Sequence, residues 1–230
     1  MIVFFDKKRK SFIITNYKVM YSTLKHQSSL TKINIKTFVR YYLYFKIFYS
    51  RKMGLYMIVR NPLSRLESFY KNKMVKSPMN RPEHKGWQDC QKIFFEYVGI
   101  KSEMKHNEKA RRIRRLTFSK FISLLPVNYE GNLHLAPQYF GDKIELSKFG
   151  LSIAINLIFD KILKLESDKD LQHLSSKLGI ELNHRRNTTF DLDYDIVWKE
   201  DEINLVKKLY AIDFERYGYN ELIATENHVK

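Results

Sequence analysis

The stretch Tyr56-Met-Ile-Val-Arg-Asn-Pro-Leu-Ser-Arg-Leu-Glu-Ser-Phe-Tyr70 decides the fold, because it predicts a buried strand that leads directly into a helix. Residues 56–59 form a short apolar run of the kind found in a covered parallel sheet. Asn61 can cap the helix, and Pro62 suits its first position, where a missing N–H costs nothing. The stretch therefore predicts a strand, a tight turn and a helix that begins at Pro62.

Three polar side chains lie near the start of this helix: Arg60, Arg65 and Ser68. A helix N-terminus gathers unpaired backbone donors and the positive end of the helix dipole, so arginines beside it make a site suited to a phosphate. Ser68 lies two turns in, but helical side chains lean toward the N-terminus, so its hydroxyl can line the same site. An ordinary strand-turn-helix with solvated arginines is the alternative interpretation.

A second turn of the same type lies upstream. Residues 11–15 are typical of a strand, residues 16–23 of a loop and residues 24–30 of the start of a helix. This order predicts a phosphate cradle at the carboxyl end of a strand, with Lys18 and two hydroxyls at its rim. It is not a Walker A loop, because the glycines and the Gly-Lys-Ser/Thr ending are absent. Lysine-rich loops are common in so basic a chain, so the loop is informative only together with the first turn.

Together the two turns resemble the sulfotransferases that use 3′-phosphoadenosine-5′-phosphosulfate, in particular the carbohydrate branch known as sulfotransferase family 2. That family carries a Lys-x-x-x-Ser/Thr loop for the 5′-phosphosulfate and an Arg-Asp/Asn-Pro-x-x-Arg-Leu-x-Ser-x-Tyr segment for the 3′-phosphate. Residues 18–23 are similar to the first and residues 60–70 to the second. Five further segments resemble the family in the same order: residues 116–122, 132–138, 162–166, 186–189 and 210–219. The likeness is to a soluble, bacterial-type member.

The resemblance implies an α/β, P-loop-like three-layer fold, with a central parallel sheet covered by helices on both faces, in a single domain over residues 1–230. It implies that the donor nucleotide contacts Lys18, Val19, Met20, Tyr21, Ser22 and Thr23 through its 5′-phosphosulfate, and Arg60 and Ser68 through its 3′-phosphate. The chain departs from the family pattern in the first loop, where Tyr17 replaces a Pro and residues 19–21 lack the usual small residue or Gly. Asn61 stands where Asp is commoner.

Sulfuryl transfer needs few protein groups, because positioning and charge stabilisation do most of the work, by analogy with phosphoryl transfer. Lys18 is the candidate for stabilising charge on the leaving phosphate, and an exposed lysine is the alternative. His134, at the family's His-x-x-Pro-Gln position, is the candidate general base, with a surface histidine as the alternative. His26 is a weaker candidate for the base. No metal is expected, since no carboxylate cluster lies near either loop.

The chain carries 41 Lys and Arg against 25 Asp and Glu, a net charge of +16. This balance favours polyanionic partners such as nucleotides, nucleic acid, acidic glycans or an anionic membrane surface. The expected partner is an acceptor glycan or another hydroxyl-bearing molecule, acidic in character, with no specific nucleic acid and with peripheral membrane contact left open. The single Cys90 cannot form an internal disulfide and no secretory signal follows Met1, which favours the cytoplasm.

Apolar strands alternate with helices along the chain, which predicts a parallel sheet with ligands at the carboxyl ends of its strands. The run 38–49 is too short and too charged to span a bilayer, and predicts a buried aromatic helix or strand. Asp168 is expected to cap a helix that ends at Gly179, and residues 201–217 have an amphipathic helical pattern.

Residues 71–115 are the least patterned part of the chain and end in a basic cluster. The cluster is either a solvated helix face or an acceptor-binding surface for an acidic glycan. It consists of Lys105, Lys109, Arg111, Arg112, Arg114 and Arg115.

Several alternatives stay open from the sequence. Glu166, after a predicted strand, is either a cofactor neighbour or a structural cap, and residues 184–187 either contact the cofactor or acceptor or form a basic loop. A kinase-like, nucleotide-binding P-loop protein is disfavoured by the missing Walker ending and magnesium carboxylate. A non-enzymatic basic RNA-binding protein fits the charge and the aromatic content, but no RNP or KH motif is present.

Overall fold

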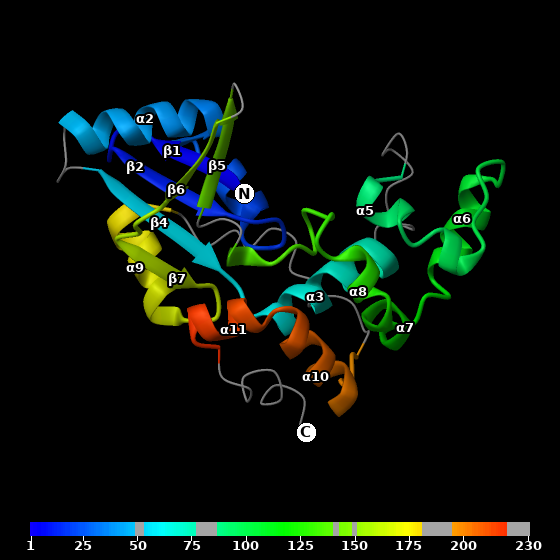
Figure 1. The fold of residues 1–230 in the computed structure, drawn as a ribbon. Helices are drawn as coiled ribbons and strands as arrows, with labels where there is room; N and C mark the ends of the chain where they lie inside the picture. Colours follow the sequence, from blue (N-terminus) through cyan, green and yellow to red (C-terminus); the bar gives the residue numbers. More distant parts are fainter. Residues whose placement is uncertain (49–52, 77–86, 140–142, 149–150, 181–194, 220–230) are drawn as a thin grey trace. The chain divides into compact units, whose positions relative to one another are not determined.

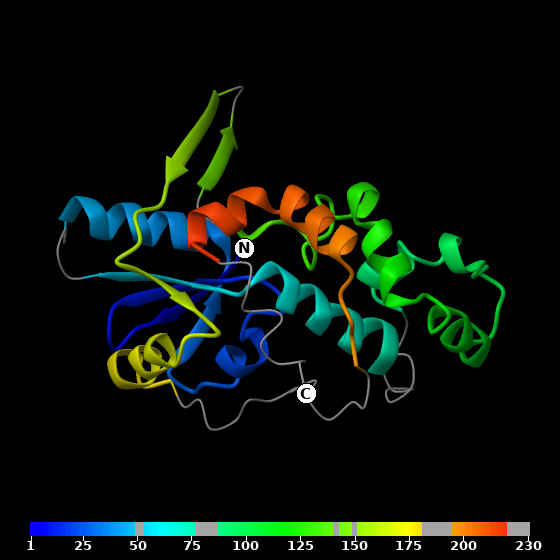
Figure 2. The same cartoon turned by 90° about the horizontal axis from the view of Figure 1, so that it is seen from below.

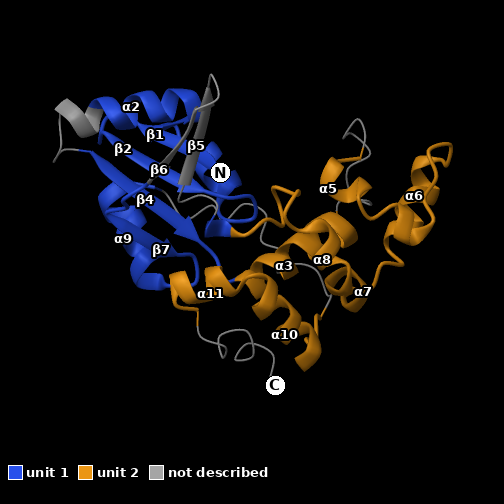
Figure 3. Cartoon of the chain, in the orientation of Figure 1, with its two compact units in different colours: residues 1–61, 138–187 blue, residues 62–137, 188–230 orange. Residues whose placement is uncertain are grey.

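The computed structural model describes residues 1–48, 53–76, 87–139, 143–148, 151–180 and 195–219. The chain divides into two compact units, each built from two stretches of sequence (Figure 3). Unit 1 comprises residues 1–61 and 138–187, and unit 2 comprises residues 62–137 and 188–230. The single domain expected over residues 1–230 stays a prediction.

Unit 1 is built on an open five-stranded sheet with the strand order β3-β1-β2-β4-β7 (Figure 1). Its strands β2, β4 and β7 run parallel, as the sequence predicted. Strand β1 lies between β3 and β2 and runs antiparallel to both, so the sheet is not all-parallel on this side. The strands are β1 (Ile2–Asp6), β2 (Ser11–Thr15), β3 (Leu30–Ile33), β4 (Gly54–Val59) and β7 (Lys161–Lys164).

Helices cover both faces of this sheet, as Figures 1 and 2 show for α2 and α9. Successive side chains of a strand point to opposite faces, so Phe12 of β2 packs edge-on against Phe38 of α2, with ring centroids 5.0 Å apart. Ile13, the next residue, belongs instead to the core cluster that includes Leu171 and Leu174 of α9. The covering helices are α1 (Tyr21–Lys25), α2 (Ile35–Phe48) and α9 (Asp168–Leu178). The predicted helical layers are therefore present in unit 1.

Helix α2 contains most of the apolar run that the sequence marked as a buried aromatic segment. Phe38, Val39 and Tyr42 are buried, while Arg40 and Tyr44 are exposed, so the helix is amphipathic. Among the described residues, no helix is both long and apolar enough to cross a membrane.

The expected helix over residues 24–30 is wrong. Helix α1 ends at Lys25, and Leu30 begins β3, which pairs with residues 3–6 of β1. Strand pairing with β1 gives the backbone of this segment its hydrogen bonds, so tertiary contacts override the local helical pattern. The segment after Gln138 also contains an antiparallel ribbon, made of β5 (Lys143–Lys148) and β6 (Leu151–Asn156).

Unit 2 is helical in its described part, and α3 begins at Pro62 as predicted. Its aromatic core includes Phe69, Phe94, Phe121 and Tyr210, all buried. The helical segments are α3 (Pro62–Tyr70), the π-helical η1 (Lys71–Lys76), α5 (Asp89–Lys92), the 3-10 helix η2 (Glu96–Val98), α6 (His106–Ile113), α7 (Phe118–Ser123), α8 (Leu125–Asn128), α10 (Glu200–Leu209) and α11 (Ala211–Tyr217).

Two helix boundaries differ from the sequence predictions. Helix α9 ends at Gly179, which takes the left-handed conformation at φ 56°, but its N-cap is Ser167, whose hydroxyl accepts from the Asp170 N–H. The amphipathic segment 201–217 is two helices, because the backbone at Tyr210 leaves the helical region at φ −109° and ψ 25°.

Candidate functional site

The loop after β2 has a strained backbone, with two residues in the left-handed conformation. Lys18 and Met20 have φ values of 68° and 54°, a left-handed conformation usual for glycine. The turn is closed by the Val19 N–H, which donates to Asn16 O at 3.2 Å, and by Thr15 Oγ1, which donates to Val19 O at 2.5 Å. Each left-handed residue costs about 1–2 kcal/mol, so the chain holds this turn without the glycine that the family pattern usually supplies.

The side chains of this loop are buried or half-buried. Val19 is buried, and Met20 and Tyr21 pack partly against the unit 1 core, so these side chains contribute to the core rather than to a ligand. Ser22 is half-buried, and Thr23 is buried. Left-handed residues at Lys18 and Met20 give the loop the kind of turn that can present backbone N–H groups to an anion.

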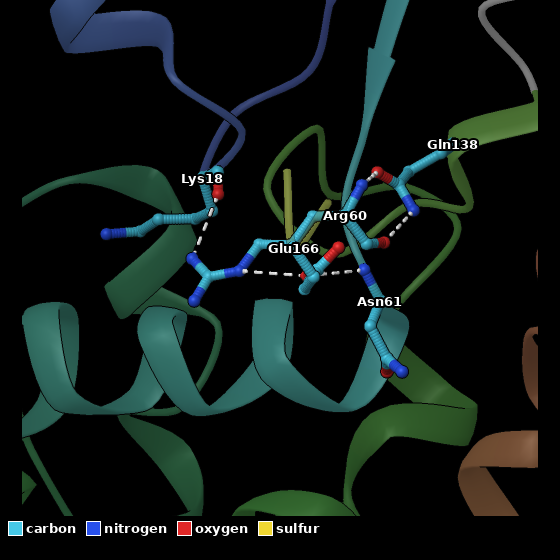
Figure 4. Close-up of polar contacts among 5 residues, drawn as sticks. All are labelled: Lys18, Arg60, Asn61, Gln138 and Glu166. Carbon is cyan, nitrogen blue, oxygen red and sulfur yellow. Dashed lines mark hydrogen bonds and ion pairs between the residues drawn. The ribbon is translucent and has the colours of Figure 1, made fainter. Parts of the chain in front are cut away.

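Arg60 and Lys18 meet at the carboxyl ends of β4 and β2 (Figure 4). Arg60 Nη1 donates to the Lys18 carbonyl at 3.3 Å, so the arginine braces the loop through its backbone. Arg60 Nε lies 3.9 Å from Glu166 Oε1, and the same carboxylate oxygen accepts from the Asn61 N–H at 3.0 Å. Parallel strands end at one edge of a sheet, which is why residues far apart in sequence gather here.

Gln138 holds the backbone of Arg60 in place at this sheet edge. Its side chain is fully buried and forms two hydrogen bonds with the backbone of Arg60 (Figure 4). The Arg60 N–H donates to Gln138 Oε1 at 2.9 Å, and Gln138 Nε2 donates to Arg60 O at 2.7 Å. Asn16 Nδ2 reaches the Gln138 carbonyl at 3.5 Å. The ends of β2, β4 and β7 are thus linked through Asn16, Gln138, Arg60 and Glu166.

Sequence analysis singled out Gln138 and Glu166 but did not predict the role that either residue has at this sheet edge. Gln138 was only part of a family motif, and Glu166 stood open between cofactor neighbour and cap. The structure shows Glu166 as the charge partner of Arg60 and as the acceptor for the turn that enters α3. The available signal was position, since Glu166 follows β7 at the same sheet edge at which Arg60 follows β4.

Arg65 does not take part in a phosphate site, contrary to the sequence prediction. Its side chain is 2% exposed, and Nη2 donates to the carbonyls of His134 at 3.1 Å and Ala136 at 2.7 Å. Burial lowers the pKa of Arg65, and the nearby negative charge of Asp213 opposes that shift. The prediction was wrong because α3 is buried on nearly every side, so a residue in its first turn faces protein.

The remaining candidates lie in different parts of the chain. Ser68 and His134 are half-buried in unit 2, whereas Lys18 and Arg60 belong to unit 1. The His134 N–H donates to Asn132 Oδ1 at 3.0 Å, and its ring centroid lies 6.0 Å from that of Phe69.

His26 is exposed at the end of α1. Residues 184–187, and the family-like segment 186–189, lie outside the described residues. Within the described ranges, no three His, Cys, Asp or Glu side chains gather as a metal site would require.

A parallel-centred α/β sheet with a lysine and an arginine where its strands end is an arrangement that can accommodate an anionic ligand. The sequence model of the sulfotransferase family, of the type called sulfotransferase family 2, matches residues 4–220. The chain therefore belongs to the sulfotransferase family, and sulfuryl transfer is the general activity that this membership supports. Searches among curated proteins and among solved structures found no match.

Replacing Gln138 by Leu should loosen the sheet edge. The change leaves the buried N–H and carbonyl of Arg60 without partners, so the free energy of unfolding should fall by about 2–4 kcal/mol. Amide exchange at Arg60 should accelerate as well. Chemical denaturation and hydrogen exchange measure the two effects.

Gln91→Leu is the matched control. Gln91 is also buried, and it also bonds two backbone groups, donating to Lys73 O at 2.8 Å and accepting from the Gln88 N–H at 3.0 Å. It should lose similar stability without faster exchange at Arg60. Equal acceleration at Arg60 in both variants would refute a local role for Gln138.

Proposed function

We propose that this protein transfers a sulfuryl group from 3′-phosphoadenosine-5′-phosphosulfate to a hydroxyl of a carbohydrate. Family membership supports the transfer, and the pairing of Lys18 with Arg60 at one sheet edge supports a donor with two separated anionic groups. That pairing is the observation on which the proposal chiefly rests. The P-loop-like character of the fold is part of the same proposal.

In this proposal the two anionic ends of the donor use the two turns. The loop 18–23 receives the 5′-phosphosulfate through backbone N–H groups, the Lys18 ammonium and the Ser22 and Thr23 hydroxyls. Arg60 and Ser68 receive the 3′-phosphate, as the family motif implies. Because Arg60 also holds the Lys18 carbonyl, losing its side chain should disturb both ends of the nucleotide.

The chemistry is an in-line displacement at sulfur. A bond forms from the acceptor hydroxyl oxygen to sulfur, and the bond from sulfur to the bridging phosphate oxygen breaks. Lys18 stabilises the charge that develops on the leaving phosphate, and His134 accepts the proton of the hydroxyl. The products are a sulfate ester and adenosine 3′,5′-bisphosphate, and the donor and these residues suffice for the step.

The acceptor surface in this proposal is the basic cluster around α6. Arg111, Arg114 and Arg115 are exposed there, whereas Arg112 is paired with Glu108 at 3.4 Å and bonds Gly99 O at 3.0 Å. Exposed guanidinium groups in and just after a helix suit carboxylates or sulfates spaced along a glycan. An acidic oligosaccharide is therefore the proposed acceptor class.

Substitutions at Arg60 and Ser68 should affect the binding of two nucleotides differently. Ser68→Ala should weaken adenosine 3′,5′-bisphosphate while sparing adenosine 5′-phosphate, since its partner exists only in the first. Arg60→Ala should weaken both nucleotides, because it also releases the Lys18 carbonyl. Isothermal titration measures the affinities. Tighter binding of ATP with an absolute magnesium requirement would favour a kinase-like protein instead.

Turnover should depend strongly on Lys18 and His134. Lys18→Ala should reduce kcat by about 10²-fold, and His134→Ala by roughly 10²–10⁴-fold with nucleotide affinity intact. The wild-type rate should fall as pH drops through the histidine range. His26→Ala serves as the comparison in a labelled-donor assay. A His26→Ala loss with normal His134→Ala turnover would transfer the role of base to His26.

Charge reversal in the basic cluster around α6 should weaken the use of acidic acceptors and leave the use of neutral acceptors unchanged. Arg111→Glu with Arg115→Glu should raise KM for hyaluronan oligosaccharides by about tenfold and flatten its salt dependence. KM for a neutral chitohexaose should be unchanged.

Lys7→Glu with Lys8→Glu is the control, because these exposed lysines lie in the β1–β2 turn, at the opposite end of β2 from Lys18, and the change in net charge is the same. Equal effects from both double variants would show that only overall charge matters.

A further inference from the structure

The segment from Asn132 to Ala136 is a turn without regular secondary structure, and most of its residues form backbone hydrogen bonds. The N–H groups of Leu135 and Ala136 both donate to Asn132 O, at 2.8 and 2.7 Å. The His134 N–H donates to the Asn132 side chain. The segment is therefore a closed turn, and the carbonyl groups of residues 134, 135 and 136 are bonded by residues outside it.

Side chains distant in sequence hold those three carbonyls in succession. Arg65 Nη2 of α3 donates to His134 O and to Ala136 O, at 3.1 and 2.7 Å. The Tyr210 hydroxyl, at the junction of α10 and α11, donates to Leu135 O at 2.6 Å. All these residues belong to unit 2.

Both donors are buried at a cost that the protein must offset elsewhere. Arg65 is 2% exposed and Tyr210 is 1% exposed, so neither can contact a dissolved ligand directly. Burying a guanidinium or a phenol is unfavourable unless its hydrogen bonds are made. The bonds to the carbonyls of residues 134–136 meet part of that requirement, and they tie both side chains to this one turn.

We infer that Arg65 and Tyr210 are positioning residues, which clamp the carbonyls of residues 134–136 and thereby fix His134 for proton transfer. This inference rests on the proposed function in so far as it takes His134 as the base. The clamp holds the backbone on both sides of the His134 peptide, and the ring of Phe69 in α3 lies beside the imidazole. Helix α3 thus supplies both the guanidinium and the aromatic neighbour of the histidine.

Neither donor of the clamp changes its protonation near neutral pH. Burial raises the pKa of Tyr210 above its ordinary value, so its hydroxyl stays protonated and remains a donor. Arg65 stays a cation in proteins even when burial lowers its pKa. A change of rate with pH near neutrality therefore reports on the base rather than on the residues that hold it.

Tyr210→Phe tests the clamp because it removes only one oxygen. Tyr70→Phe is the matched control: Tyr70 is equally buried, and its hydroxyl donates to Leu116 O at 2.7 Å, in the core of the same unit. Arg65→Lys is the second variant, which keeps the charge but loses the planar fork. Hydrogen exchange, nucleotide titration and turnover on hyaluronan oligosaccharides are measured for each in the full chain.

Tyr210→Phe should speed amide exchange at residues 134–136 about tenfold and lower kcat about tenfold, because small misplacements of a reacting group cost rate. KM for the donor and the affinity for adenosine 3′,5′-bisphosphate should stay within about twofold. Arg65→Lys should act in the same direction. Tyr70→Phe should change neither the exchange at 134–136 nor kcat.

Unchanged exchange in Tyr210→Phe would overturn the clamp. Faster exchange with normal kcat would overturn its positioning role. A wild-type protein that does not bind the bisphosphate would count against the proposed function, and that result is separate from the exchange result.

Discussion

The paired hydrogen bonds between Gln138 and the backbone of Arg60 are the constraint on which the candidate site depends. A strand end in water would leave the Arg60 N–H and carbonyl to solvent, but here one buried amide satisfies both. Since the backbone of Arg60 is fixed, its guanidinium can reach the Lys18 carbonyl and Glu166. The loop after β2 is thereby held against the end of β4 although it lacks a glycine.

The ion pair at this edge is a weak one. Arg60 and Glu166 are each 22% exposed, and their closest charged atoms are 3.9 Å apart, so their pairing contributes at most about 1 kcal/mol. Glu166 is better understood as orienting Arg60 and the Asn61 N–H. In the proposed function a phosphate competes with Glu166 for the guanidinium, because it offers several acceptor oxygens and more charge.

Much of the fold followed from local signals in the sequence, and the errors came where distant contacts decide. Pro62 began its helix as predicted, because proline restricts φ whatever lies around it. Leu30 joined a strand because β1 offered it a partner, which local periodicity does not reveal. Sequence analysis placed Arg60 and Lys18 at one sheet edge, because the carboxyl ends of parallel strands lie on the same side of a sheet. It misplaced Arg65 because it cannot show which helix faces are buried, and it gave no role to Gln138, whose partner is backbone 78 residues away.

The central claim is that the carboxyl edge of β2 and β4 binds the donor nucleotide, and amide hydrogen exchange tests it most directly. Exchange is compared with and without saturating adenosine 3′,5′-bisphosphate, without magnesium. The account predicts protection concentrated at residues 18–23 and 60–61, and its loss in Arg60→Ala. Protection confined to other parts of the chain, or its absence at saturation, would contradict the account.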